Sequence, residues 1–139
     1  MDAESLGPER AALQRARLHV RSARRRLRER KIAAGIATLY DSLTSGMDWF
    51  LASPERRAHA GLDATPHDDN STFAALVRAG VLDGSFDFNG FQRLVYRGLD
   101  EELPDVDHAI LHGAESVLAQ LGVLPFDEAG LPPEDPNTL

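Results

Sequence analysis

Three side chains that could hold a metal ion recur at helical spacing late in the chain. His108, His112 and Glu115 are spaced i, i+4 and i+7, so a helix would place them along one face. Imidazoles four residues apart bind zinc in zincin-type metalloproteases, but there a Glu follows the first His as general base, and here Ala109 follows it. At about 100° per residue, the stripe lies roughly 130° from the centre of the apolar stripe of the same helix. We expect a solvated face, and a metal-dependent hydrolase stays an alternative that needs Asp107 or another helix.

The stretch DGSFDFNGF, residues 83–91, resembles the second half of a calcium-binding EF-hand loop. Aligned on Gly84 as the sixth loop position, Asp83 and Asp87 fall where calcium ligands belong. The first, third and twelfth positions, which should supply carboxylates, are Ala79, Val81 and Gly90. We therefore expect a turn at Asp83-Gly84 and a helix N-cap at Asp87, without a calcium site.

Positive charge is concentrated at the N-terminal end. Residues 1–31 hold ten of the 15 Lys and Arg and four acidic residues, which gives a net charge of +6. Since the whole chain has a net charge of −7, the residues after 31 carry −13. A basic segment on an acidic body can bind an external polyanion, the acidic surface of another copy, or its own body. Composition leaves these three alternatives open.

The run RARLHVRSARRRLRERK supplies the candidate nucleic-acid-binding residues, because several guanidinium groups could meet one phosphate backbone. These residues are Arg17, Arg21, Arg24, Arg25 and Arg28. No aromatic residues are interleaved for stacking on bases, and the acidic body would repel a polyanion. The sequence also lacks nucleophile-elbow, phosphate-loop and dinucleotide-binding motifs and contains no cysteine, so we assign no catalytic residue and no cofactor.

These residues sit on segments whose apolar spacing is helical. No proline interrupts residues 9–51, where a wide apolar stripe comprises Ile32, Ile36, Leu39, Tyr40, Leu43, Met47, Phe50 and Leu51. Upstream, a narrower stripe repeats every seven residues at Leu6, Leu13, Val20 and Leu27, with Ala16 and Ala23 between. A single helix over residues 8–52 would reach about 68 Å. A helix of that length is too long to lie inside one compact domain of this size. It must therefore break near the Arg-rich turn before residue 32, or project from the domain and pack against a partner.

The second half of the chain predicts shorter helices. Residues 53–71 read as a surface connection with one helical turn at residues 55–59, followed by a helix with Asn70 or Ser71 as N-cap that ends at Gly80. A helix over residues 87–103 should turn Phe88, Phe91, Leu94, Val95 and Leu99 inward. A last helix over residues 105–121 should bury Ile110, Leu111, Ala114, Val117, Leu118 and Leu121 and stop at Gly122. Val123, Leu124 and Phe126 should attach the start of the proline-rich tail to the bundle.

The segment RKIAAGIATLYDSLTSGMDWFL, with Tyr40 and Asp41 midway and a polar loop and three shorter helices after it, resembles the HEPN family of small helical bundles. The resemblance covers about residues 30–122. Members that cleave RNA carry an Arg, four to six residues, then a His in a late helix. Arg93 and Arg97 have no His at that distance. The resemblance thus implies a ribonuclease-inactive member that binds nucleotides or proteins, often as a dimer.

Together these observations predict an all-α protein, an antiparallel bundle of four to five helices with a long Arg-rich N-terminal helix. We expect a basic helical arm (1–31), a bundle domain (32–126) and a flexible acidic, proline-rich tail (127–139). The expected function is non-catalytic protein association, as a homodimer through the N-terminal helix, with nucleic-acid binding as the alternative. The first residues lack a secretory signal pattern and no apolar run spans a bilayer, so a cytoplasmic location without a membrane partner is expected.

Overall fold

The regular structure is helical throughout the residues that the computed structural model describes, which are 7–62, 66, 68–104 and 108–134. The helices are α2 (Pro8–Arg28), α3 (Ile32–Ala52), α4 (Pro54–Ala60), α5 (Asp69–Arg78), α6 (Phe88–Asp100), α7 (His108–Leu121) and the 3-10 helix η1 (Glu128–Gly130). No strand occurs in these ranges. The prediction of an all-α helical bundle is confirmed. None of the helices described has both the length and the apolar character that crossing a bilayer requires.

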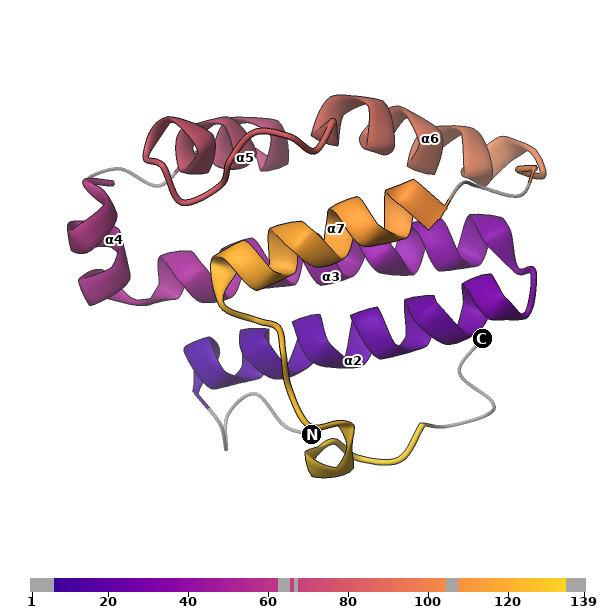
Figure 1. The fold of residues 1–139 in the computed structure, drawn as a ribbon, viewed down its shortest axis with the longest axis horizontal. Helices are drawn as coiled ribbons and strands as arrows, with labels where there is room; N and C mark the ends of the chain where they lie inside the picture. The colour runs from indigo at the N-terminus through magenta and orange to yellow at the C-terminus, as the bar shows by residue number, and fades with distance from the viewer. Residues whose placement is uncertain (1–6, 63–65, 67, 105–107, 135–139) are drawn as a thin grey trace.

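The long proline-free segment breaks between α2 and α3, which was one of the two predicted alternatives. Arg30 has a φ of 65°, in the left-handed region, and it follows the last turn of α2. Its N–H donates to the carbonyl of Leu27 at 3.2 Å, and the Lys31 N–H donates to the carbonyl of Arg26 at 2.9 Å. This pair of bonds is the Schellman arrangement that ends a helix. The chain therefore turns back, and α2 lies alongside α3 (Figure 1).

The seven-residue stripe of α2 packs against α3 in the same chain. Ala16, Val20 and Ala23 are fully buried, and Leu13 and Leu27 pack at the edge of the same core. Leu6, the first member of the predicted stripe, lies outside the described residues. The small alanines let the two helices approach closely. The predicted boundary at residue 31 between an arm and a bundle domain stays a prediction.

Helix α3 is the central helix of the bundle. It contacts α2, α6 and α7, and Figure 1 shows α3 between α2 and the pair formed by α5 and α6. Ile36, Leu39 and Leu43 are fully buried. Ser42 is buried as well, and its hydroxyl donates to the carbonyl of Leu39 at 2.7 Å, which satisfies the polar group inside the core. Helix α3 is thus buried on more sides than one apolar stripe would predict.

The polar connection before α5 contains a cap, two or three residues earlier than predicted. The N-cap is Asp68, whose side chain accepts a hydrogen bond from the N–H of Ser71 at 2.7 Å, so the prediction of Asn70 or Ser71 as N-cap is wrong. Asp68 has the extended backbone of an N-cap, and its carboxylate reaches the third helical residue. The predicted stop at Gly80 is confirmed by its φ of 80° after the last turn.

Helix α6 departs from the prediction at its C-terminal end. It ends at Asp100, and Leu99, which was predicted to face inward, has 73% of its surface exposed. The reason lies in Leu103, which is buried in the core after the helix has ended and packs under Gly98. Leu103 fills the space beneath the last turn of α6. Leu99 is therefore left on the outside.

The C-terminal segment, defined here as residues 122–134, leaves the end of α7 and crosses α2 (Figure 1). Val123 is fully buried, and Leu124 and Phe126 pack against the core, as predicted. Farther along, η1 and the residues after it lie on the side of α2 that faces away from α6. The predicted flexibility of residues 127–139 stays a prediction, and residues 135–139 lie outside the described residues.

Candidate functional site

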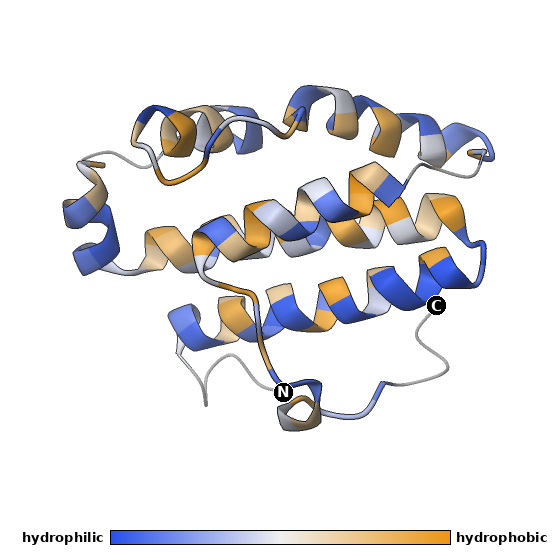
Figure 2. Ribbon diagram, viewed as in Figure 1, coloured by the Kyte–Doolittle hydropathy of each residue, from blue (hydrophilic) through white to orange (hydrophobic). Residues whose placement is uncertain are grey.

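The arginines singled out in the sequence form a basic face of α2, defined here as Arg17, Arg21, Arg24, Arg25 and Arg28. Four of them belong to the C-terminal half of α2, where hydrophilic residues cluster in Figure 2. The C-terminal segment crosses α2 (Figure 1), and its residues bind Arg17 and Arg25 of this face. Of the three partners that composition left open, the structure brings this face to the acidic residues of its own chain.

Arg17 holds the apolar start of the C-terminal segment. Its Nε donates to the backbone carbonyl of Val123 at 3.2 Å, and its guanidinium carbon lies 5.3 Å from the centroid of the Phe126 ring. The contact with the ring is a cation–π interaction. Arg17 therefore binds a main-chain oxygen and an aromatic side chain of one extended peptide.

Arg24 joins α2 to two acidic residues from different elements. Its Nε and Nη2 both donate to Glu115 Oε2 of α7, at 2.9 and 2.5 Å. Its Nη1 lies 3.6 Å from Glu128 Oε1 in η1. The planar guanidinium suits this double use, because its N–H groups point in several fixed directions.

Arg25 binds the far end of the segment. Its Nε donates to Glu134 Oε1 at 2.7 Å, and the same oxygen accepts a hydrogen bond from Ser22 Oγ at 3.2 Å. Burial alone would raise the pKa of Glu134, but the hydrogen bonds from Arg25 and Ser22 lower that pKa below its ordinary value. Glu134 is therefore ionised when it is docked at neutral pH.

The remaining two arginines of the basic face are less engaged. Arg28 is exposed. The Nε of Arg21 is shielded from solvent and has no hydrogen-bond partner among the described residues, although the positive charge of Arg21 contributes to the lowered pKa of Glu134. The basic face thus has donor capacity that its own segment leaves unused.

The candidate metal ligands on α7 do not converge. His108 and His112 are exposed, as predicted for a solvated stripe, and their ring centroids are 6.4 Å apart. Glu115 is bound to Arg24 of α2. Within the described ranges no group of three His, Cys, Asp or Glu could hold a metal ion, and Asp107 lies outside those ranges.

The calcium-like corner is a turn followed by a capped helix. Asp83 Oδ1 accepts hydrogen bonds from the N–H of Ser85 at 2.9 Å and from its hydroxyl at 2.7 Å. Both hydrogen bonds lower the pKa of Asp83, and the bond from the Ser85 backbone N–H has the larger effect. Asp87 caps α6 by accepting the N–H of Gly90 at 3.0 Å, and this predicted cap is confirmed.

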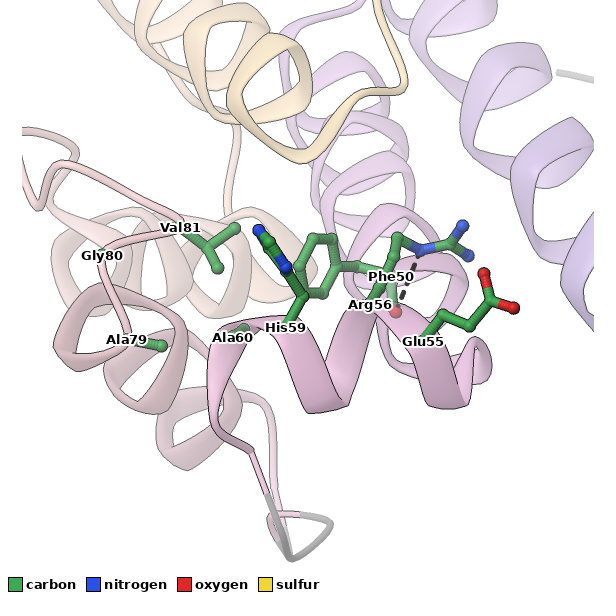
Figure 3. A pocket seen from close by; sticks show the side chains of 8 residues that line it. All are labelled: Phe50, Glu55, Arg56, His59, Ala60, Ala79, Gly80 and Val81. Carbon is green, nitrogen blue, oxygen red and sulfur yellow. Dashed lines mark hydrogen bonds between the residues drawn. The ribbon is translucent and has the colours of Figure 1, made fainter.

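Sequence reasoning missed a pocket of about 650 Å³ between α4 and the end of α5. Figure 3 shows the residues that line it, which are Phe50, Glu55, Arg56, His59, Ala60, Ala79, Gly80 and Val81. Arg56 is committed to structure, since it stacks on Trp49 and bonds backbone carbonyls at the end of α3. The pocket joins an apolar floor to the imidazole of His59. Only the helical turn at residues 55–59 was visible in the sequence.

A second missed feature is the outer side of α6. Tyr96 and Leu99 have 59% and 73% of their surfaces exposed, and they are the large apolar side chains that the described residues leave open to solvent. They lie three residues apart, next to each other on one side of the helix. Arg93 and Asp100 flank them and are exposed as well.

Comparison with known protein families, curated proteins and solved structures finds no match for this chain. The residues themselves must therefore support any functional conclusion.

Proposed function

We propose that this chain is a non-catalytic helical-bundle protein that acts by protein association, and that two copies associate through α6. The observation that carries the proposal is the exposure of Tyr96 and Leu99. Large apolar side chains that lie side by side in solvent are typical of a surface that another protein covers. The apolar stripe of α2, which suggested association through the N-terminal helix, is used inside the chain.

The order of charges along α6 favours a second copy as the partner. Arg93 precedes Tyr96, and Asp100 follows Leu99 at the end of the helix. Two such helices packed in opposite directions about a two-fold axis between Tyr96 and Arg97 place each Arg93 beside Asp100 of the partner copy. Antiparallel packing of the two α6 helices also places the positive end of each helix dipole beside the negative end of the other, which is favourable. The 13 residues of α6 span about 20 Å, so the contact is small and the dimer is weak.

Charge reversal tests the pairing. Arg93→Glu and Asp100→Arg each place like charges together across the two-fold axis, so each single variant should shift the monomer–dimer equilibrium toward monomer. The double variant Arg93→Glu/Asp100→Arg restores opposite charges and should restore the dimer. Analytical ultracentrifugation over a concentration series measures all four proteins. A monomeric wild type, or a double variant that stays as monomeric as the single variants, would overturn the proposal.

We also propose the finer architecture within which this association takes place. The short connection at residues 29–31 favours helices α2 and α3 that run antiparallel to each other, as in the predicted bundle. We further propose that the chain is related to the HEPN family of small helical bundles and that it is located in the cytoplasm. The absence of the Arg–His spacing of RNA-cleaving members supports a role in binding.

A further inference from the structure

The basic face of α2 already binds a peptide, because the C-terminal segment, which includes the short helix η1, lies across it. Three kinds of contact hold that segment. Arg17 binds a backbone carbonyl and an aromatic ring, Arg24 faces the carboxylate of Glu128, and Arg25 binds the carboxylate of Glu134. Each of these arginines therefore meets a different group of one ligand.

We propose that the basic face of α2 is a docking surface for acidic segments of partner proteins, and that residues 126–134 occupy it as an internal competitor. This surface lies on the opposite side of the bundle from α6 (Figure 1). The inference therefore goes beyond the proposed self-association and does not depend on it.

The segment has a fixed part and a releasable part. Val123 is fully buried and Leu124 packs against the core, so these two residues fix the start of the segment. The later contacts are ion pairs between partly exposed side chains, and Glu128 has 54% of its side-chain surface exposed. Ion pairs of this kind contribute little and weaken as salt rises. Residues 126–134 can therefore leave α2 while the fully buried residues of the core stay in place, although Phe126 gives up its packing at the edge of the core.

The released surface is matched to an acidic peptide. Fork-shaped guanidinium groups bind carboxylates with two parallel N–H groups, and Arg17 accepts an aromatic ring. The exposed guanidinium of Arg28 adds a donor that a competing ligand could use. A partner segment with an aromatic residue followed by several Asp or Glu would reproduce the contacts of the internal segment and add one.

Charge distribution favours a peptide over a nucleic acid. Outside residues 1–31 the chain carries a net charge of −13. A long phosphate backbone that reached α2 would also approach this acidic body, whereas a short acidic peptide needs only the basic face. In addition, the aromatic group of the observed contact comes from the bound segment, Phe126, and not from α2.

A competition experiment on the full chain tests the inference. The probe is a fluorescein-labelled synthetic peptide, LPFDEAGLPPE, with the sequence of residues 124–134. Fluorescence anisotropy compares wild type with Glu128→Gln/Glu134→Gln, whose own segment has lost its charged contacts. We expect the variant to bind the probe about five- to tenfold more tightly, because two partly exposed ion pairs of the competitor are gone. The gain should shrink as the salt concentration rises.

Matched variants assign the binding to the basic face. Adding Arg25→Gln to the double variant should remove most of the gain, whereas Arg78→Gln, an exposed arginine of α5, should leave it unchanged. Far-UV circular dichroism checks that each variant is folded. Equal probe binding by wild type and Glu128→Gln/Glu134→Gln would overturn the inference. A gain for a single-stranded oligonucleotide without a gain for the peptide would also overturn it and assign the surface to nucleic acid.

Discussion

The guanidinium carbon of Arg56 lies 3.9 Å from the centroid of the Trp49 ring. The same group donates hydrogen bonds to the carbonyls of Trp49 at 2.5 Å and Phe50 at 3.2 Å, and to Glu9 Oε1 at 2.7 Å. Both carbonyls belong to the last turn of α3, where the helix itself supplies no donor. One side chain of α4 therefore closes the end of α3 and ties it to the start of α2.

Replacing Arg56 by Ala should lower the free energy of unfolding by about 2 kcal/mol, because two helix-end carbonyls and the Trp49 ring lose their partner together. Urea unfolding followed by tryptophan fluorescence measures the loss. Arg56→Lys should lower the free energy of unfolding nearly as much as Arg56→Ala, since an ammonium group cannot stack on the ring and donate hydrogen bonds in several directions at once. Arg78→Ala is the control and should change stability by less than about 0.5 kcal/mol. Equal losses for Arg56→Ala and Arg78→Ala would contradict this role.

Gly122, where the chain leaves α7, should not tolerate a side chain. Its φ is 98°, a conformation that L residues rarely adopt, and a Cβ there would lie 3.2 Å from the Trp49 ring. Gly122→Ala should therefore destabilise the fold by about 1–2 kcal/mol. Gly130→Ala is the matched control, because a Cβ at Gly130 meets no atom within 4 Å. Thermal unfolding should separate the two variants, and similar melting temperatures would show that the conformation of Gly122 is not constrained.

Tyr40 should make stability depend on alkaline pH. Its hydroxyl donates to Asp69 Oδ2 at 2.7 Å, and burial together with this bond raises the pKa of Tyr40 to about 12. The folded state therefore favours the neutral phenol. Its contribution is complete below the ordinary tyrosine pKa of about 10 and is lost as the pH rises toward 12.

Ultraviolet absorbance of the phenolate tests this expectation in the Tyr96→Phe variant, where Tyr40 is the only tyrosine left to titrate. The titration midpoint of the folded protein should lie above that of the protein unfolded in urea. Tyr40→Phe should flatten the fall in stability between pH 10 and 12. A midpoint that does not move between folded and unfolded protein would rule out the bond to Asp69 as a determinant of stability.

Several helix boundaries and most of the core could be predicted from the sequence because their causes are local. Gly80 and Gly122 end helices through their own backbone conformation, and Asp87 caps α6 three residues away. The inward residues of α7 followed from their spacing alone, with Ala114 and Leu118 fully buried. The candidate site was predictable only in part, since composition identified the arginines of α2 but left their partners open.

Those partners and the exposed face of α6 were decided by tertiary structure. Arg25 and Glu134 are 109 positions apart, and only the path of the chain from the end of α7 across α2 brings them to 2.7 Å. Leu99 has the spacing of an inward residue but lies outside because Leu103, beyond the end of the helix, occupies the space beneath it. Helices and their ends depend on contacts within a few residues, which the sequence determines by itself. Which face of a helix is covered, and which charge finds which partner, depends on segments that are distant in the chain and meet only when it folds.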